Sequence, residues 1–469
     1  MSARAERRLA ARVRSIEVPL LVGAAASLCL IGVVSMRGLP YGWPAGNWFY
    51  PYLRSFQIRS LLSFAVVLPC ALALAHFSLR SIDRREWATL LVCLGVGFAL
   101  QLAMRWPYPF PIEMVVRSVV ANSFYEPSLR LGLAEFIRNH AALLDSLPMH
   151  THTNMPGKLS LYIVLGWLTH SPLVMGWLVI ILSNFGGLLV YRIAREFVDR
   201  RAGVFALILY LFLPSKLFFF PLLNTVSPLL ILISFDLFLR FLGSGRPIFA
   251  LLLGVALYFT LFFDPIPLAM GLAFAAFVVR SSYRGELGVG GAALLVGGTA
   301  VGFAVVHAAM WWGLQFDVFA TLAEMIDKNT AGHARLSRSY EVWLVGNLVE
   351  FALGLGMIQV VIFLAVLGRA LRRITWSRVD LERLTEPGTL LAFSLLGVLV
   401  CLDLLGMTMG EVIRTWIFLA CFFPIVTAYF CARKSSSLLF GAVLSLLLLE
   451  AVVPLGMVGF VIPVDQLRP

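Results

Sequence analysis

Long apolar runs separated by short polar segments make up most of this 469-residue chain. Many runs reach the roughly 20 residues that a helix needs to cross the hydrocarbon core of a bilayer. Because the bilayer core holds no water for unpaired backbone groups, such runs are expected to be helices. The pattern predicts an all-α, polytopic transmembrane bundle, with one integral membrane domain over residues 1–469. About thirteen spans are expected, at residues 17–36, 58–79, 87–104, 173–191, 203–220, 228–242, 247–263, 266–280, 288–314, 342–366, 388–407, 412–430 and 437–460.

Two long polar segments interrupt this pattern, at residues 105–158 and 315–341. The apolar stretch 159–169 that follows the first segment is too short to cross a bilayer, so a re-entrant or interfacial helix is expected there. Within the first segment, residues 129–144 are expected to be helical. We therefore predict one large loop with juxtamembrane helices at 105–170 and a second loop at 315–341.

The composition agrees with a membrane protein, since 60% of residues are hydrophobic, 13% are charged and the mean hydropathy is +0.89. A soluble domain would carry roughly 25% charged residues. The net charge of +12 does not indicate a nucleic-acid partner, because the basic residues are scattered in short segments between apolar runs. This distribution is typical of contact with anionic membrane lipids.

The basic residues also predict an orientation. If the N-terminus is cytoplasmic, most of the 37 Lys and Arg residues lie in cytoplasmic segments, as the positive-inside rule requires. The basic stretch from Arg4 to Arg14 then begins a retained signal anchor rather than a cleaved signal peptide. In this topology residues 105–158 and 315–341 lie on the outer side, and residues 192–202 and 369–385 lie in the cytoplasm.

Acidic residues of the first loop are candidates for proton transfer. Glu126 follows Tyr125 and precedes a proline, so it is expected at a turn. A carboxylate there could deprotonate an acceptor hydroxyl. We take Glu126 as the candidate catalytic base, Glu113 as the second choice and Tyr125 as a substrate contact. The alternative is that Glu126 only charges the first turn of the helix that follows.

The end of the first loop, His150-Thr-His-Thr-Asn-Met-Pro-Gly-Lys158, carries candidate ligands for an anion. His150 and His152 share one face of an extended segment, where they could bind a phosphate, hold a metal or orient the loop. A His pair without a third ligand is weak evidence for a divalent metal, and hydrogen-bonded loop histidines are the alternative. Lys158 either reaches the lipid headgroups or meets a lipid phosphate. With Asn154, these residues are the predicted donor-binding group of this loop.

Two further groups are candidates for the same outer side. Glu411 and Arg414 are three residues apart at the end of an apolar run, where they form either a salt bridge or part of a site. The second loop contributes a cationic patch suited to a phosphate, with a solvated loop as the alternative. The patch consists of Lys328, His333, Arg335 and Arg338.

These motifs resemble those of a family. The segments Asn122-Ser-Phe-Tyr-Glu-Pro-Ser-Leu-Arg130 and Leu147-Pro-Met-His-Thr-His-Thr-Asn-Met-Pro-Gly-Lys158 are similar to an aromatic–acid pair and a His-x-x-x-His-Pro-Pro-Gly stretch in bacterial GT-C-type membrane glycosyltransferases. Gly410-Glu-Val-Ile-Arg-Thr-Trp416 resembles a late Gly-Glu-x-x-Arg-x-Trp element of that branch. The basic turn in residues 191–202 matches the cytoplasmic turn of the superfamily.

The resemblance implies a function. It implies a polyprenyl-phosphate sugar donor, inverting transfer to a lipid or cell-envelope glycan, and a site on the outer face of a bacterial inner membrane. Departures are also visible: residues 37–57 contain no acid after the first span, and Asn224-Thr225 stand where relatives often have Asp. The alternatives are a transporter or flippase of lipid-linked substrates and a catalytically inactive GT-C-like protein.

Overall fold

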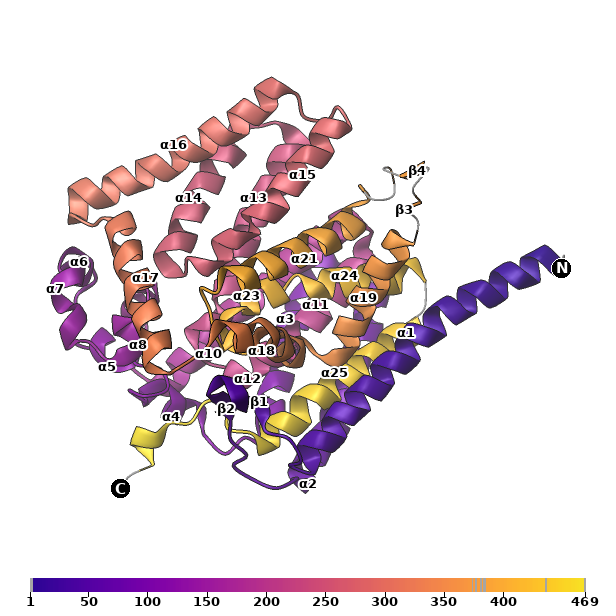
Figure 1. Cartoon of the computed structure of the whole chain (residues 1–469), viewed down its shortest axis with the longest axis horizontal. Coiled ribbons are helices and arrows are strands. Elements are labelled where there is room, and N and C mark those ends of the chain that lie inside the picture. The colour runs from indigo at the N-terminus through magenta and orange to yellow at the C-terminus, as the bar shows by residue number, and fades with distance from the viewer. Residues whose placement is uncertain are drawn as a thin grey trace.

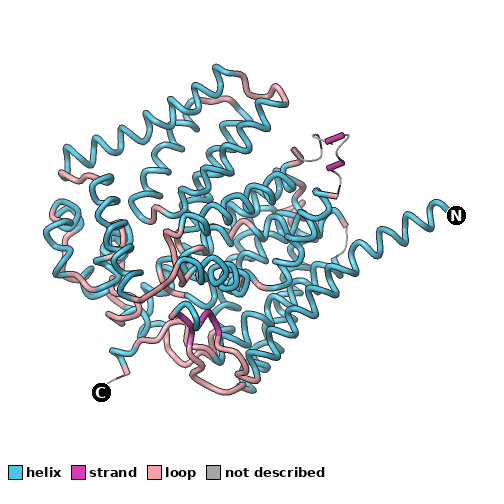
Figure 2. Tube along the Cα trace, viewed as in Figure 1, coloured by secondary structure: helices cyan, strands magenta, loops and turns pink. Residues whose placement is uncertain are grey.

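Helices account for most of the computed structural model (Figures 1 and 2). It describes residues 3–372, 374–375, 378–379, 382, 385–434 and 437–467, with side chains from residue 17 onward except those of residues 374–375 and 378–379. The first part of the chain forms α1 (Ala3–Ser35), β1 (Tyr41–Trp43), η1 (Pro44–Gly46), β2 (Trp48–Tyr50), α2 (Ile58–Ser81) and α3 (Glu86–Met104). The next part forms α4 (Ile112–Arg117), α5 (Tyr125–Ser128), α6 (Leu133–Arg138), α7 (His140–Leu143), η2 (Leu144–Ser146), α8 (Met149–His152) and α9 (Gly157–Gly166).

The remaining elements are again nearly all helices. The middle of the chain forms α10 (Pro172–Phe197), α11 (Arg200–Leu211), α12 (Pro214–Phe219), η3 (Leu223–Thr225), α13 (Ser227–Ser244), α14 (Pro247–Phe263), η4 (Ile266–Met270), α15 (Gly271–Tyr283) and α16 (Val289–Leu314). The last part forms α17 (Val318–Arg335), α18 (Tyr340–Leu355), α19 (Met357–Leu371), β3 (Ile374–Thr375), β4 (Arg378–Val379), α21 (Pro387–Leu405), α22 (Val412–Thr415), α23 (Ile417–Ala420), α24 (Phe423–Arg433), α25 (Ser437–Met457) and η5 (Val464–Gln466). The strands form two short antiparallel pairs, β1–β2 and β3–β4.

The predicted all-α membrane bundle is confirmed. Within the described residues, ten helices are long and apolar enough to cross a membrane, or eleven if α18 and α19 form one bent span. Two other expected spans are helical but shorter, at Pro247–Phe263 and Ile417–Arg433. Each of the thirteen expected segments thus contains helix, although not all reach full spanning length.

Three expected spans are not single straight helices. The span expected at 342–366 bends by 109° between α18 and α19, at Gly356, whose φ of 91° favours glycine. The span expected at 203–220 breaks before Pro214, which begins α12. The span expected at 412–430 is divided into α22, α23 and α24. Apolar composition alone therefore did not reveal where these helices change direction.

The polar segments also differ from expectation. Residues 129–144 do not form one helix: α6 and α7 are separate four- to six-residue helices that meet at Asn139, and η2 follows. Residues 315–341 are mainly helix rather than loop. Asp317 caps α17, since its carboxylate accepts hydrogen bonds from the backbone N–H groups of Phe319 and Ala320. The expected short helix after residue 158 is present as α9, and most of its residues are buried.

The two predicted outer segments lie at one end of the bundle. Figure 1 shows α5 to α8 and α17 at this end, near β1 and β2, whereas β3, β4 and the N-terminus lie at the opposite end. The helices α13 to α16 form one flank of the molecule, and α1, α2 and α25 form the other. The long loops gather around β1 and β2 (Figure 2). The polar side chains of several distant segments are therefore available to one site.

The orientation is directly testable by thiol labelling. We expect Arg138→Cys, on exposed α6, to react with a membrane-impermeant maleimide added outside intact cells, and Arg201→Cys, in the exposed first turn of α11, to react only after permeabilisation. Labelling of both positions from the same side would contradict the topology. The parent protein is the control, since its two exposed cysteines, Cys29 and Cys70, lie on apolar helices that an impermeant reagent does not reach.

Candidate functional site

Five charged or titratable side chains from three separated segments meet at this end of the bundle. We call them the polar cluster: His150, Lys158, Arg338, Glu411 and Arg414. Glu411 is the common partner, because one carboxylate oxygen lies 3.2 Å from the Arg338 guanidinium and the other accepts a hydrogen bond from Arg414. Charged hydrogen bonds of this kind are stronger than neutral ones. All five are candidate binding residues from the sequence, Arg338 only as one member of the cationic patch, and the structure brings them together.

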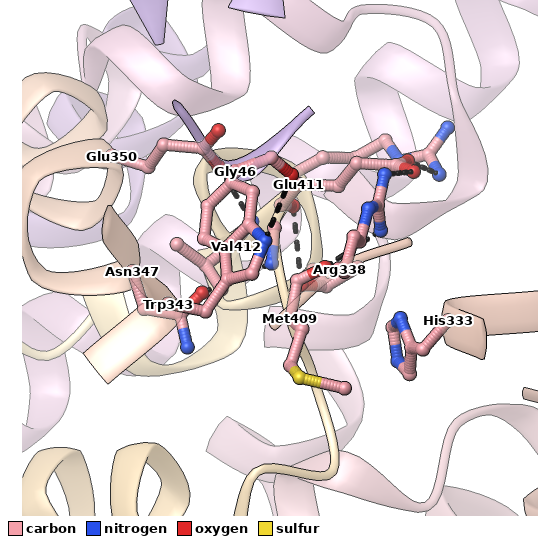
Figure 3. Close-up of polar contacts among 12 residues, drawn as sticks. Gly46, His333, Arg338, Trp343, Asn347, Glu350, Met409, Glu411 and Val412 are labelled. Atoms are coloured by element: carbon pink, nitrogen blue, oxygen red, sulfur yellow. Dashed lines mark hydrogen bonds and ion pairs between the residues drawn. The ribbon is translucent and has the colours of Figure 1, made fainter. Parts of the chain in front are cut away.

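Arg338 is the centre of the polar cluster. Its guanidinium donates to the Met409 carbonyl at 2.6 Å as well as to Glu411 (Figure 3). It also lies over the Trp48 ring, 4.8 Å from the centroid, and near the Trp343 ring at 5.9 Å. The residue is only 8% exposed. Stacking of a buried guanidinium on aromatic faces fixes the plane in which its N–H groups point.

Two buried guanidinium nitrogens of the cluster lack a protein partner. Among the described residues, neither Arg338 Nε nor Arg414 Nε makes a hydrogen bond, although both atoms are buried. Buried donors are almost always paired in folded proteins. These two N–H groups are therefore the clearest sign that the cluster binds an additional acceptor.

The chain segment that carries Glu411 is held by α18. The Asn347 side chain donates to the Thr408 carbonyl and accepts from the Gly410 backbone N–H, each at 3.0 Å. Glu350 accepts from the Val412 N–H at 3.0 Å, which caps the first turn of α22. Both Asn347 and Glu350 are buried. These bonds stabilise Glu411 in a left-handed conformation, with φ of 59°, that a non-glycine residue rarely adopts.

His150 approaches the cluster from α8. Burial and the positive charge of Arg414 lower the pKa of the His150 imidazole to about 4, although Glu411 acts in the opposite direction. The imidazole is therefore neutral at pH 7. Asn154 stabilises the helix end by donating to the His150 carbonyl at 2.7 Å. A neutral ring can accept a proton or a hydrogen bond, which an imidazolium cannot do.

Lys158 reaches the cluster from the start of α9. Its ammonium donates to Asn154 Oδ1 at 2.7 Å and lies 3.8 Å from Asp264 Oδ2. Asp264 in turn accepts a hydrogen bond from Ser227 at 2.8 Å. Burial lowers the pKa of Lys158, Asp264 raises it and Arg414 lowers it further, which places Lys158 and Arg414 in one electrostatic environment.

The position of Lys158 depends on Gly157. A Cβ at Gly157 would lie 2.6 Å from the Phe262 carbonyl oxygen and 2.6 Å from Phe263 Cα. Only glycine allows α9 to approach the end of α14 this closely. The Pro-Gly-Lys part of the motif thus places the Lys158 ammonium next to Asp264.

The charges around Glu411 keep it ionised. Burial alone would raise its pKa, but Arg414 and Arg338 together hold the pKa of the Glu411 carboxyl below its usual range. His333 lies at the edge of this group, with Nε2 3.4 Å from the Met407 carbonyl oxygen (Figure 3). Burial lowers the pKa of His333, and the nearby charge of Arg338 acts in the same direction. The imidazole is therefore neutral at pH 7, so His333 lies at the edge of the cluster without supplying the positive charge expected of the cationic patch.

The candidate catalytic acids make no described contact with the polar cluster. Glu126 is on α5 with its side chain 43% exposed, and it pairs with Arg130 at 3.7 Å. Glu113 is a half-buried residue in the first turn of α4. The Tyr125 hydroxyl donates to the His170 carbonyl at 2.7 Å. The structure describes no direct contact between these three residues and Arg338 or Glu411.

Three other predicted ligands also point elsewhere. His152 Nδ1 lies 2.8 Å from the Leu144 carbonyl oxygen and 4.0 Å from Asp145. Lys328 pairs with Glu324 at 3.0 Å along α17. Arg335 is exposed. The expected grouping of His150 with His152 on one face is wrong, because residues 149–152 form a helical turn rather than an extended segment.

The residues present do not suit a metal ion. Within the part of the chain that the structure describes, no group of three or more His, Cys, Asp or Glu side chains is arranged to hold one. His150 faces the cluster while His152 contacts the Leu144 carbonyl. The donor set of the cluster is instead cationic, which favours an anion.

An apolar groove lies at the hairpin β1–β2 and the helices α1 and α18. Its volume is about 440 Å³, and it is lined by the end of α1, by residues 39–45 including β1, and by Val349 and Leu353 of α18. The same helix α18 carries Asn347 and Glu350, and β2 carries Trp48 beneath Arg338. The groove and the cluster are therefore built on the same hairpin and helix.

The sequence did not single out several residues of this site. Asn347 and Glu350 are three apart within an apolar run, so they share a helix face, and that spacing was the available signal. Arg338 was one member of a cationic patch, with nothing in the sequence to mark it as the buried one. Asp264 stood alone between two apolar runs.

Comparison with known proteins adds no identification. No family model matches the chain, and no curated protein matches it.

Proposed function

We propose that this chain is a membrane glycosyltransferase of the GT-C type, which moves a sugar from a polyprenyl-phosphate donor to a hydroxyl of a lipid or cell-envelope glycan. The transfer takes place at the outer face of a bacterial inner membrane. The observation that carries the proposal is the pair of buried guanidinium N–H groups of Arg338 and Arg414, which have no partner among the described residues, together with an apolar groove built on the same hairpin and helix. A ligand with a phosphate head and a hydrocarbon tail satisfies both features.

The charge of the cluster suits a phosphate. Arg338, Arg414 and Lys158 supply three positive charges, against which Glu411 and Asp264 supply two negative ones. A phosphodiester adds one further negative charge. Planar guanidinium groups present paired N–H donors to phosphate oxygens.

The groove suits the tail of such a donor. Its lining comes mainly from Leu30, Val33, Val34, Leu39, Val349 and Leu353. Burial of isoprene units there would stabilise the complex by roughly 25 cal/mol for each Å² of apolar surface removed from water. A free sugar phosphate would gain nothing from the groove, so the site favours a lipid-linked donor.

The proposed reaction needs a leaving group, a nucleophile and a base. The acceptor oxygen attacks the anomeric carbon of the donor, and the bond from that carbon to the phosphate oxygen breaks with its electron pair remaining on phosphate. Arg338 and Arg414 stabilise the charge that develops on the leaving phosphate. The hydroxyl proton passes to a carboxylate, for which Glu126 is the candidate from sequence.

The role of Glu126 can be tested directly. We expect Glu126→Gln to lower turnover by roughly two orders of magnitude or more, because the amide cannot accept the proton. The melting temperature should not change, since the Glu126 side chain is partly exposed. Arg130→Gln is the matched control, because it removes the ion-pair partner and leaves the carboxylate. Unchanged turnover in Glu126→Gln would transfer the role to Glu113 or Glu411, or leave Glu126 as a helix-end charge.

The proposed function itself is tested with donors. Purified protein in nanodiscs is incubated with a panel of radiolabelled polyprenyl-phosphate monosaccharides and with membrane lipid or glycan acceptors. We expect label transfer from one donor, and competition by the unlabelled polyprenyl phosphate. Binding of polyprenyl phosphate without transfer from any donor would favour the catalytically inactive alternative.

A transporter of lipid-linked substrates is the second candidate function. The span formed by α11 and α12 is fully buried and broken before Pro214, and the buried Lys216 follows the break, 3.3 Å from Asn184 Oδ1. Broken helices with buried ionisable residues are typical of transporters. Movement of a fluorescent polyprenyl-phosphate analogue between the two leaflets of the proteoliposome membrane, without sugar transfer, would favour this function.

A further inference from the structure

The segment that follows α25 crosses the same end of the bundle as the polar cluster. We call residues 457–467 the strap. The Met457 carbonyl accepts the backbone N–H of Leu53 at 2.9 Å, and the Gly459 N–H donates to the Pro51 carbonyl at 2.8 Å. Further on, the Tyr108 hydroxyl donates to the Val461 carbonyl at 2.7 Å. The strap is thus bonded to the segment after β2 and to the start of the large loop.

The end of the strap contacts a tight turn at residues 118–123. Asp465 Oδ2 accepts the Val119 backbone N–H at 2.8 Å, and Asp465 Oδ1 accepts the Ser118 hydroxyl. The turn closes on itself, because the Ser118 carbonyl accepts the Ser123 N–H at 3.1 Å. Ser123 has φ of 64°, a left-handed conformation that surrounding bonds must stabilise. Both carboxylate oxygens of Asp465 are therefore used to hold one end of this turn.

The other end of the turn holds α8. The Thr151 hydroxyl donates to the Ser123 carbonyl at 2.7 Å, and the His150 backbone N–H lies 3.4 Å from the Ser123 hydroxyl oxygen. The His150 imidazole is in hydrogen-bonding contact with the Val120 carbonyl. The turn therefore determines the position of His150.

We infer that Asp465 is a positioning residue for the site. It fixes the turn 118–123 and, through that turn, the position of the His150 side chain relative to Glu411 and Arg414. Asp465 is outside the polar cluster and acts on the turn only through the Ser118 hydroxyl and the Val119 backbone N–H. These donors, with the Gln466 side-chain amide at 3.2 Å, hold the pKa of the Asp465 carboxyl below its usual range, against the effect of burial, so the ionised form is present at neutral pH. The effect on turnover rests on the proposed function, whereas the effect on His150 does not.

The surroundings of His150 give the inference a measurable signal. The charged groups that act on its ring are Arg414 and Glu411 of the segment 409–416 and Lys158 of α9. Burial is the largest cause of the low pKa of His150. If the turn is no longer fixed, the ring gains water and loses its fixed distance to Arg414, and its pKa rises toward the usual value of about 6.5.

The test uses the full chain in nanodiscs, with imidazole carbons labelled and the seven histidines followed by NMR between pH 3.5 and 8. The His150 signal is assigned by its absence in His150→Gln. We expect the His150 signal to titrate near pH 4 in the parent protein. In Asp465→Asn we expect the midpoint of this titration at a proton concentration at least tenfold lower. Asp145→Asn is the matched control, since Asp145 is an exposed carboxylate of the same region, and its His150 titration should equal that of the parent.

Two further variants separate positioning from folding. Ser118→Ala removes one of the two donors that the turn supplies to Asp465, and we expect a smaller change in the His150 titration with the melting temperature retained. It also carries the test if Asp465→Asn does not fold. An unchanged His150 titration in both variants would overturn the inference. If the parent shows no sugar transfer but the titration moves as expected, the proposed function fails and the positioning role stands.

Discussion

Replacing Arg338 with methionine should weaken binding of a polyprenyl-phosphate donor by at least about a hundredfold, which corresponds to roughly 3 kcal/mol. The change removes a buried cation that stacks on Trp48 and bonds to Glu411 and Met409. Glu411 then has Arg414 as its remaining arginine partner, so less positive charge is left for the phosphate. Binding can be followed by the fluorescence of the tryptophans around the site during titration with the donor in nanodiscs.

Two other variants show whether the loss is specific. Arg338→Lys keeps the positive charge but not the planar donor group, so affinity should fall to a value between those of the parent and Arg338→Met. Arg335→Met removes an exposed arginine three residues away, and affinity should stay within about 0.5 kcal/mol of the parent. Equal donor affinity in Arg338→Met and the parent would remove the cluster as the phosphate site.

Replacing Gly157 with alanine should destabilise the protein by roughly 1–3 kcal/mol and lower turnover with it. The new Cβ would meet backbone atoms of Phe262 and Phe263 at 2.6 Å, and backbone cannot move aside as a flexible side chain can. The start of α9 must shift away from α14, which separates Lys158 from Asp264. The melting temperature and the rate of sugar transfer are the two measurements.

Gly166→Ala supplies the control on the same helix. A Cβ there would meet only the Met175 methyl group, at an ordinary 3.7 Å. Stability and turnover should therefore remain close to those of the parent. A Gly157→Ala protein as stable and active as Gly166→Ala would show that the close approach of α9 to α14 is not required.

The sequence predicted the helical, membrane-spanning character of the fold better than the directions and boundaries of its helices. Long apolar runs and a low charged fraction require helices that cross a bilayer, and the structure has them. The 109° turn at Gly356 was not predictable, because a single glycine within an apolar run has the same composition whether the helix continues or bends. The helix at Val318–Arg335 was missed because its polar residues suggested a loop, although they lie on one face of an amphipathic helix.

The site was predictable where short motifs carry several polar groups. His150 and Lys158 come from one short polar motif and Glu411 and Arg414 from another, and the polarity of these motifs in an otherwise apolar chain indicated them. Arg338 could not be distinguished in this way, since its importance comes from burial between Trp48, Trp343 and Glu411. Such burial depends on how α18 packs against the β1–η1 segment, which sequence spacing does not encode.

The bend between α18 and α19 has a consequence for the bilayer in which the protein works. If α19 crosses the membrane near its normal, α18, at 109° to it, lies nearly in the membrane plane. Asn347 and Glu350 on α18 then fix the depth of the polar cluster relative to the acyl chains. A thinner bilayer increases the tilt of the spanning helices to relieve hydrophobic mismatch, and a thicker bilayer reduces it. The same change in tilt would rotate α18 out of the membrane plane. The length of the lipid acyl chains would then affect how closely a phosphate at headgroup level approaches Arg338 and Arg414.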